Sequence, residues 1–526
     1  MHRWPLDSLR SPLDSLRSLG AALVGALVAL VLLPPVATAQ TNPAAQIAQL
    51  WRLQHERAIL DELMTLLAVP NVSSDKPNIQ RNAELIAKMI EARGLTPKLA
   101  SVPGGNQVVV TDIRTPGATR TIGLYAHYDG QPLEPKEWAP PPFEPVLRNR
   151  PVEDGGMPIP LPAAGARIDP EWRLYARGAG DDKAPIVAML TALDAIRSAG
   201  IRMNSNVKLA FEGEEEIESP NLEKTIAANK DLFAADVWLI CDGPVYQTRQ
   251  QSLIFGARGV TRFEITVYGP RNELHSGHYG NWAPNPALEL ARLLASMKNE
   301  KGHVVIPGFY DQVEPLGPTE QDAIASAPPI DRQLRRDFWL GATDEAPKPL
   351  YELLTQPSLN IRGMASSRTG AQASNVIPST AVATLDIRLV KGMEVGRTQQ
   401  LVRDFIARKG FYVTDREPDA ETRRSHPKVA KVIFGVGTEA RRTSMELPIA
   451  QEVIRTVESA RGPVVKLPTM GATVPLEAFE RPLGTTTIIV PMANHDDNQH
   501  TFNENLRLQN LWDGIEVFAA LFSGLR

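Results

Sequence analysis

Four short, uniformly apolar runs interleaved with helical patterns constrain the fold more than any other feature of the chain. They are "TIGLYA" (121–126), "NVKLAF" (206–211), "DVWLIC" (236–241) and "TTTIIV" (485–490). Strands that are apolar on both sides are typical of a parallel sheet buried under helices. A helix is expected over 183–200, where apolar residues recur at helical spacing up to Gly200. We therefore predict an α/β fold, a mainly parallel sheet covered by helices on both faces.

A second pattern begins near Phe255. "VTRFEITVYG" and "TAVATLDIRLV" alternate apolar and polar residues, as strands with one exposed face do, and an amphipathic helical pattern lies between them. This indicates a smaller α+β lid or dimerisation domain inserted into the first. The predicted division is catalytic domain 40–255, inserted domain 256–435 and catalytic domain 436–526. Eleven prolines between Pro132 and Pro170 predict an irregular loop there.

The N-terminus has the pattern of a leader. Arginines 3, 10 and 17 precede the apolar run 19–33, and Ala37-Thr38-Ala39 fits an A-x-A cleavage site. We interpret 1–39 as a signal peptide and expect a periplasmic or secreted protein. The alternative is an uncleaved anchor, the only case in which we expect a membrane partner, and the run is short for a span.

Charge and cysteine content argue against a nucleic-acid-binding protein and against a fold held by disulfides. The net charge is −4, from 56 Lys and Arg against 60 Asp and Glu, so no nucleic-acid partner is expected. Cys241 is the one cysteine, so no internal disulfide can form.

Acidic and histidine residues follow the apolar runs. His127 and Asp129 follow the first, Glu212–Glu216 the second and Asp242 the third, while Asp181 and Asp182 open the helix, and His495 and His500 follow the fourth. In open α/β sheets, ligands bind outside the carboxyl ends of the strands. We expect these side chains to meet at one edge of the sheet.

Carboxylates gathered at one place repel each other, and divalent cations remove that cost. Carboxylate and imidazole ligands without thiolate suit zinc, or else manganese or cobalt. Two cations with a shared carboxylate would leave a further carboxylate free as a base. Taken singly, the same residues have plainer interpretations: Asp181-Asp182 as a helix cap and Asp242 as part of a turn.

Four motifs carry a family resemblance: "YAHYDGQP", "LYARGAGDDKAP", "FEGEEEIES" and "NQHTFNE". Together they resemble the dizinc metallopeptidases that include carnosinase, glutamate carboxypeptidase, aminoacylase and succinyl-diaminopimelate desuccinylase. The resemblance covers about residue 45 to 526 and is closest to the dipeptidase members, which have an aspartate at the position of Asp242. Ala184 and Glu218 stand where the family has glycine.

The resemblance implies two divalent ions, zinc above all. His127 and Asp242 would hold one ion, Glu216 and His500 the other, and Asp181 would bridge both. His495 is a rival to His500, which is preferred because "HTFNE" carries the match.

Catalytic roles are implied in the same way. Glu215 would be the general base acting on the water between the two ions, and Asp129 would orient His127. The segment "NELHSGHYGN" resembles the family's lid segment, in which His275 would polarise the scissile carbonyl, from the partner subunit in many dimeric members.

The resemblance also implies residues that bind the substrate. "SNVIPSTAVATLDIRLV" supplies Asn375 and Arg388 as carboxylate-binding residues, and "GATVPL" supplies Thr473 as a substrate-contacting hydroxyl. A homodimer is implied by analogy.

Three functions follow. The first is metal-dependent hydrolysis of dipeptides or short peptides with a free C-terminal carboxylate. The second keeps the same centre but acts on N-acyl or N-carbamoyl amino acids. The third is a non-catalytic binding protein, against which the complete set of ligands and base argues.

Overall fold

An eight-stranded sheet, built from both ends of the chain, forms the first core of the computed structural model, which describes residues 42–526. The predicted signal peptide, 1–39, lies outside these residues. In spatial order the strands are β1 (Pro97–Ala100), β2 (Val108–Ile113), β6 (Asn206–Glu212), β3 (Thr121–His127), β7 (Val237–Ile240), β19 (Thr486–Ile489), β8 (Ser252–Ile254) and β18 (Val465–Leu467).

The centre of this sheet is parallel, as the uniformly apolar runs predict. The pairs β6–β3, β3–β7 and β7–β19 are parallel, and so is the pair β8–β18. Antiparallel pairing is found at β1–β2, β2–β6 and β19–β8. The prediction of a mainly parallel sheet is confirmed.

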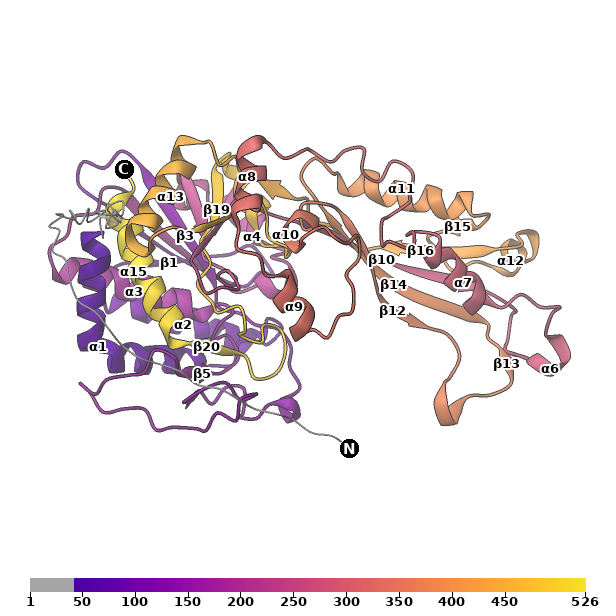
Figure 1. The fold of residues 1–526 in the computed structure, drawn as a ribbon, viewed down its shortest axis with the longest axis horizontal. Helices are drawn as coiled ribbons and strands as arrows, with labels where there is room; N and C mark the ends of the chain where they lie inside the picture. Colours follow the sequence, from indigo (N-terminus) through magenta and orange to yellow (C-terminus); the bar gives the residue numbers. More distant parts are fainter. Residues whose placement is uncertain (1–41) are drawn as a thin grey trace, which may run out of the picture. The chain divides into compact units, whose positions relative to one another are not determined.

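Helices cover both faces of the sheet (Figure 1). In β7, Leu239 packs into one core cluster, while Trp238 and Ile240 pack into the other. The first cluster holds residues of α1 (Pro43–Leu67), α2 (Lys76–Glu91), α3 (Lys183–Ser198), α13 (Pro448–Arg461) and α15 (Leu508–Gly524). The second holds residues of α4 (Leu222–Ala228), α5 (Lys230–Phe233) and α14 (Leu476–Leu483).

The ends of the described chain meet in the first helical layer, where indigo α1 and yellow α15 lie side by side (Figure 1). Side-chain caps fix the starts of α1 and α2: Asn42 accepts from the amides of Ala44 and Ala45, and Asp75 from that of Asn78. None of the helices within 42–526 has the length and apolar character that a membrane crossing requires.

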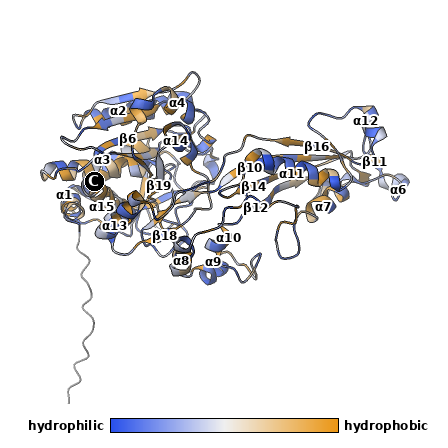
Figure 2. Cartoon of the chain, turned by 90° about the horizontal axis from the view of Figure 1, so that it is seen from above, coloured by the Kyte–Doolittle hydropathy of each residue, from blue (hydrophilic) through white to orange (hydrophobic). Residues whose placement is uncertain are grey.

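A second sheet has a core of its own. Its order is β12 (Ser358–Ala365), β14 (Thr380–Leu389), β10 (Gly259–Tyr268), β16 (Val429–Phe434) and β15 (Tyr412–Thr414). It is covered by α7 (Pro286–Ala295) and α11 (Val395–Arg408), whose surfaces are hydrophobic on one side and hydrophilic on the other (Figure 2). The alternating runs thus form antiparallel neighbours, β10 and β14. The boundaries at 255 and 435 stay a prediction.

Beyond this sheet, two strands that are distant in sequence, β11 (Leu274–His275) and β13 (Val376–Ile377), form a small antiparallel pair next to α6 (Ser276–Tyr279). α12 (Ala420–Ser425) follows β15. A two-stranded pair, β9 (Gly256–Ala257) with β17 (Arg441–Arg442), lies where the chain passes between the two sheets in sequence.

The segment between α7 and β12 is divided between the two sheets: Met297, Val304 and Phe309 still belong to the core of the second sheet, whereas the later part leaves it. This later part contains α8 (Pro318–Ser326), α9 (Asp331–Asp337) and α10 (Leu350–Leu353). Ile330 belongs to the apolar cluster on one face of the eight-stranded sheet, together with Ile254 and Leu467, and Tyr351 packs against that cluster. The chain therefore returns from the second sheet to the first before β12.

The proline-rich segment is more regular than its composition predicts. β4 (Val146–Arg148) pairs with β5 (Arg173–Tyr175), which pairs with β20 (Asn505–Arg507). Only short stretches, such as η1 (Pro135–Glu137), interrupt the coil before β4. The expected irregular loop is thus wrong at β4, because a partner strand from the far end of the sequence stabilises β5.

Candidate metal centre

The residues predicted at the strand ends do meet. His127 is the last residue of β3, Glu215 and Glu216 open the short helix η2 (Glu215–Ile217) behind β6, and Asp242 follows β7 by two positions. Asp181 precedes α3, and His500 lies in the loop between β19 and β20. Parallel strands place their carboxyl ends at a common edge, which is why distant segments deliver these side chains to one place.

Asp181 lies between the two histidines. Its Oδ1 is 2.9 Å from His127 Nε2, and its Oδ2 is 3.1 Å from His500 Nε2. Gln499 donates to the same Oδ2 at 2.7 Å. A carboxylate whose two oxygens face two separate imidazoles has the arrangement of a bridge between two cations.

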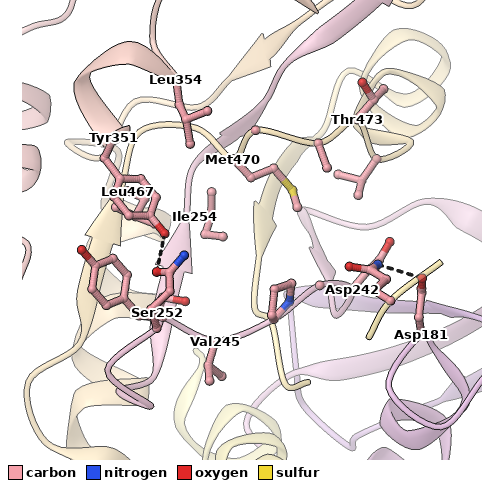
Figure 3. Close-up of a pocket in the computed structure, with 18 of the residues that line it drawn as sticks. Asp181, Asp242, Val245, Ser252, Ile254, Tyr351, Leu354, Leu467, Met470 and Thr473 are labelled. Carbon is pink, nitrogen blue, oxygen red and sulfur yellow. Dashed lines mark hydrogen bonds between the residues drawn. The ribbon is translucent and has the colours of Figure 1, made fainter. Parts of the chain in front are cut away.

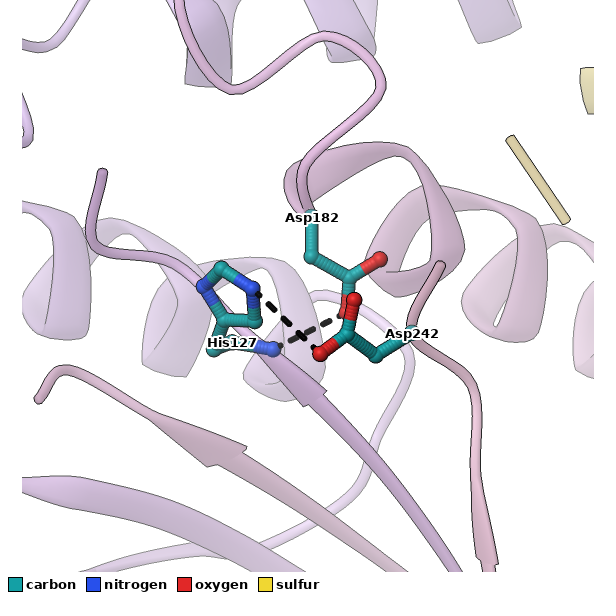
Figure 4. Close-up of side chains that lie close together, drawn as sticks. All are labelled: His127, Asp182 and Asp242. Carbon is teal, nitrogen blue, oxygen red and sulfur yellow. Dashed lines mark hydrogen bonds and ion pairs between the residues drawn. The ribbon is translucent and has the colours of Figure 1, made fainter. Parts of the chain in front are cut away.

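Two groups of potential ligands lie on either side of this bridge. One contains Asp181, Glu216 and His500, and the other His127, Asp182 and Asp242. The latter three are drawn in Figure 4, where His127 Nε2 faces Asp242 Oδ2 at 3.9 Å. Asp182 is engaged elsewhere, because its Oδ2 accepts the backbone N–H of His127 at 3.2 Å.

The Asp182 side chain therefore fixes the end of β3. It makes no capping hydrogen bond to α3, so a plain helix cap does not account for it. Sequence reasoning placed Asp182 in the acidic pair but gave it no role of its own.

Asp129 holds two parts of the site at once. Its carboxylate lies 3.5 Å from His127 Nδ1 and accepts the backbone N–H groups of Glu215 and Glu216, each at 3.1 Å. Ser73 donates a further hydrogen bond to Oδ2 at 2.7 Å. Asp129 therefore lies where it can orient His127, as expected, and it also fixes the backbone of Glu215 and Glu216. The sequence pattern alone did not indicate this second contact.

Glu216 is oriented but not satisfied. Its Oε2 lies 3.1 Å from His500 Nε2 and accepts from Gln131 Nε2 at 2.8 Å. Its Oε1 is buried and has no hydrogen-bond partner. A buried carboxylate oxygen without a partner is costly, and a cation would remove that cost.

Electrostatics at this edge also call for positive charge. Burial, with Asp181 and Glu216 nearby, raises the pKa of Asp242 to about 7. Burial and the neighbouring carboxylates raise the pKa of Glu215 well above its usual range. Hydrogen bonds to Asp181 and Glu216 raise the pKa of His500 to about 11. A cation at this edge would offset the same repulsion between carboxylates that raises the pKa of Asp242 and Glu215.

The donor set therefore fits divalent cations. It consists of carboxylate oxygens and imidazole nitrogens without a thiolate, since Cys241 is buried at the end of β7 and belongs to a core cluster. Such ligands suit zinc, manganese or cobalt.

Glu504 is a positioning residue that sequence reasoning missed. It is fully buried and accepts the backbone N–H groups of Gly180 and Asp181 at 2.9 and 3.0 Å. Arg177 donates to its other oxygen at 2.8 Å. Its place in "NQHTFNE", beside the matched histidine, was the available signal.

His495 does not join the cluster. Its Nδ1 is buried without a hydrogen-bond partner, and burial lowers its pKa. Among the described residues, the groups arranged for a metal ion include His500 and not His495.

We call the sheet edge where His127, Asp181, Glu215, Glu216, Asp242 and His500 meet the metal edge. Two cavities open there and share Glu215, Thr473 and His500. The first, of about 270 Å³, extends from Asp181 and Asp242 towards Ile254, Leu354 and Met470 (Figure 3). The second, of about 240 Å³, is lined by Arg262 and Arg388.

Arg388 and Thr473 are brought together in the second cavity. Arg388 donates to Thr473 Oγ1 at 3.0 Å, and its Nε lies 3.7 Å from Asp386. Arg262 shares this wall and pairs with Glu218. Glu218, at the position where the resemblance has glycine, adopts φ 71°, a value that glycine reaches without the steric cost of a side chain.

His275 and Asn375 lie elsewhere. Both are exposed, and they meet at the β11–β13 pair, where the backbone carbonyl of Asn375 accepts the N–H of Ser276 at 2.9 Å. The ring of His275 accepts from the N–H of Gly277 at 3.0 Å. Neither residue lines a cavity at the metal edge.

Comparison with known proteins gives a consistent set of relatives. Residues 123–523 match the model of peptidase family M20/M25/M40. The chain is 26 % identical over 486 residues to a Cys-Gly metallodipeptidase of Schizosaccharomyces pombe, covering 87 % of this chain and 94 % of that protein. It is also 26 % identical to the Beta-Ala-His dipeptidase of Homo sapiens, covering 79 % of this chain and 76 % of that protein.

Solved structures agree. An M20 family metallo-carboxypeptidase of Sulfolobus solfataricus superposes with a TM-score of 0.73 at 25 % identity, over 89 % of this chain and 99 % of that one. Human carnosine dipeptidase 1, at 22 % identity, shares the fold with a TM-score of 0.69 over 91 % of this chain and 99 % of that one.

These relatives overturn one prediction. The Cys-Gly metallodipeptidases of Schizosaccharomyces pombe, Candida albicans and Saccharomyces cerevisiae, each similar over 87 % of this chain, are cytosolic enzymes. The expected periplasmic or secreted location is therefore wrong. It rested on the composition of a short N-terminal segment, and an apolar run behind arginines is a pattern that does not by itself fix a destination.

Proposed function

Because the chain belongs to the M20/M25/M40 peptidase family, we propose that it is a metal-dependent dipeptidase. It hydrolyses the amide bond of dipeptides or short peptides that carry a free C-terminal carboxylate. The observation that carries the proposal is Asp181, whose two carboxylate oxygens face His127 and His500 at 2.9 and 3.1 Å.

Two divalent ions, zinc in our proposal and otherwise manganese or cobalt, would be held at this edge. His127 and Asp242 would hold one, Glu216 and His500 the other, and Asp181 both. The unpartnered Glu216 Oε1 supports this assignment. When bound, such ions would supply Lewis acidity and lower the pKa of a water molecule, so that it can lose a proton and act as a nucleophile at neutral pH.

Glu215 serves as the general base. Asp129 fixes its backbone, and its side chain, 14 % exposed, borders both cavities. The Glu215 carboxylate takes a proton from the attacking water and passes it to the leaving amine. A carboxyl whose pKa is raised by burial is suited to hold that proton between the two transfers.

Arg388 and Thr473 bind the C-terminal end of the substrate. A guanidinium can donate to both oxygens of a carboxylate, which fixes the register of the peptide relative to Glu215. Thr473 Oγ1 accepts from Arg388 and donates to the carbonyl of Arg258, so the hydroxyl holds the guanidinium in place.

His275 and Asn375 act in a homodimer. Both are exposed at the β11–β13 pair and lie outside the two cavities at the metal edge of their own chain, which supports delivery to the site of a second copy. There His275 would donate to the oxygen of the scissile carbonyl as negative charge develops on it.

The test is hydrolysis of a panel of dipeptides and N-acyl amino acids by the purified protein supplied with zinc or manganese. Chelator-sensitive release of amino acids from dipeptides is expected. Release from acylated substrates alone, which have no free α-amine, would contradict the proposal and assign the protein to the deacylases.

A further inference from the structure

The first cavity changes character along its length. At one end lie Asp181 and Asp242, and towards the other end Ile254, Leu354 and Met470 extend their side chains into it (Figure 3). All the charged side chains among the described residues that line this cavity belong to the metal edge itself. Away from that edge the wall is neutral, with Gln247 and Ser252 as polar members.

Two tyrosines close the far end. The rings of Tyr246 and Tyr351 stack with centroids 5.2 Å apart at 26°. Both are held by their hydroxyl groups, since Tyr246 donates to the carbonyl of Pro328 and Tyr351 donates to Gln247 Oε1 at 2.8 Å. They are thus a fixed wall rather than two freely rotating rings.

A separate cavity of about 630 Å³ lies behind this wall. Tyr246 and Tyr351 line both this cavity and the first one. Proline and apolar residues such as Pro328, Pro349 and Ile324 line the larger cavity. The stacked rings therefore separate a small chamber at the metal edge from a larger one. Removal of the Tyr351 ring would join them.

The substrate can be placed relative to these walls, on the premise of the proposed function. Arg388 fixes the C-terminal carboxylate in the other cavity, and Glu215 stands where the two cavities meet. The residue on the amino side of the scissile bond is then directed into the first cavity. With about 270 Å³, that cavity is below the range of typical small-molecule pockets, about 300 to 1,000 Å³, and suits one amino acid.

We propose that the first cavity selects dipeptides whose N-terminal residue has a neutral apolar side chain, and that the Tyr246–Tyr351 pair limits its length. A charged side chain there would lose its hydration without gaining a partner. Tyr351 and Leu354, which lie at α10 and directly after it, act as specificity-determining residues.

The first test is a kinetic panel of X-Gly dipeptides with the zinc-loaded full chain. Values of kcat/KM for Leu-Gly and Phe-Gly are expected to exceed those for Lys-Gly and Asp-Gly by roughly tenfold or more. Tyr351→Ala should raise the ratio of Trp-Gly to Leu-Gly by about tenfold, because the chamber then extends into the cavity behind it. Leu354→Glu should raise the ratio of Lys-Gly to Leu-Gly by about as much.

Leu353→Ala is the matched control. Leu353 is in the same helix but lines neither cavity, so the ratios should remain those of the wild type. Tyr351→Phe keeps the ring but loses the hydrogen bond to Gln247, so its size limit should lie between those of the wild type and Tyr351→Ala.

The second test does not depend on turnover. Calorimetric titration of the wild type with free leucine, phenylalanine, lysine and glutamate should give the tightest binding for the two apolar amino acids. Leu354→Glu should move the preference towards lysine.

Two results would overturn the inference. If dipeptides are cleaved without preference at the N-terminal residue and Tyr351→Ala and Leu354→Glu leave the ratios unchanged, the subsite is wrong while the proposed function stands. If zinc-loaded protein cleaves no dipeptide of any kind, the proposed function fails and the subsite fails with it.

Discussion

The metal edge and the β11–β13 pair carry the two halves of the proposed catalytic apparatus, and they are built in opposite ways. At the edge, His127 and Asp129 are fully buried, and the backbone N–H groups of Asp181 and Glu215 donate to the carboxylates of Glu504 and Asp129, which fixes the backbone there. At the β11–β13 pair, His275 and Asn375 are exposed, and nearby Trp282 is 79 % exposed. In the proposed function, the ligands and the base at the edge come from one chain, whereas the β11–β13 pair acts against a second copy.

This contrast explains what each half can tolerate. Charges that are buried together need fixed partners, and removal of one partner leaves the others uncompensated. A histidine on an exposed turn makes few contacts, so its replacement should leave the fold intact and affect only what it meets. The predictions that follow use this difference, from the largest expected effect to the smallest.

The largest effect is expected at the base. Glu215→Gln keeps the size of the side chain but cannot accept a proton, so kcat should fall by about 10²–10⁴-fold. Metal content, measured by plasma mass spectrometry, should stay at the wild-type level. A variant that loses both activity and metal would show that Glu215 is a ligand instead.

The second prediction joins the two halves. His275→Ala should lower kcat by about 10²–10³-fold, the effect of losing one donor to a developing oxyanion, without changing the melting temperature. Asp181→Asn should also be inactive.

Mixing these two inactive variants after dissociation and reassociation should restore activity. In a statistical mixture of dimers, about a quarter of the wild-type sites would combine an intact edge with an intact His275 from the other copy. If the mixture stays inactive while size-exclusion chromatography shows mixed dimers, His275 does not act across the interface.

The third prediction concerns the carboxylate site. Arg388→Ala should lower kcat/KM for dipeptides by roughly 10- to 100-fold, because a charge-assisted hydrogen bond to a carboxylate contributes about 1.5–3 kcal/mol. A dipeptide amide, which has no terminal carboxylate, should be a poor substrate for the wild type and equally poor for the variant. An equal loss on both substrates would place Arg388 in a structural role.

The smallest effect is on stability without metal. Burial and nearby carboxylates raise the pKa of Asp242 to about 7, and hydrogen bonds to Asp181 and Glu216 raise that of His500 to about 11. In the unfolded chain these values are about 3.9 and 6.5.

Both shifts have the same sign between pH 6 and 8. The folded protein binds more protons than the unfolded chain there, so the free energy of unfolding falls as pH rises. The melting temperature of chelated protein should drop by a few degrees, on the order expected for small changes in free energy. Zinc should reduce this drop in melting temperature. A chelated protein whose melting temperature is higher at pH 8 than at pH 6 would contradict the prediction.

That these side chains meet at one sheet edge can be predicted from the sequence because its signals are local. Each proposed ligand follows a short apolar run or opens a helix, and the parallel sheet brings the ends of those runs together. The residues that hold the ligands are harder to find. Glu504, Ser73 and Gln131 act through hydrogen bonds to partners far away in the sequence, so no periodicity marks them.

Long-range packing also explains the errors in the fold. β4 forms within a proline-rich segment because β5 pairs with β20, which lies more than 300 residues away. The return of α8–α10 to the first sheet is equally invisible in the pattern, although it supplies Tyr351 to the cavity. The location predicted from the leader failed for another reason, since it came from composition without any contact behind it.

The most direct test of the central claim is the amino acid released from Leu-Gly by protein reconstituted with zinc, measured before and after chelation. We expect steady release by protein that holds two zinc ions per chain, loss of release on chelation, and recovery when zinc is returned. Protein that holds two zinc ions per chain and releases nothing from Leu-Gly or any other dipeptide would contradict the claim.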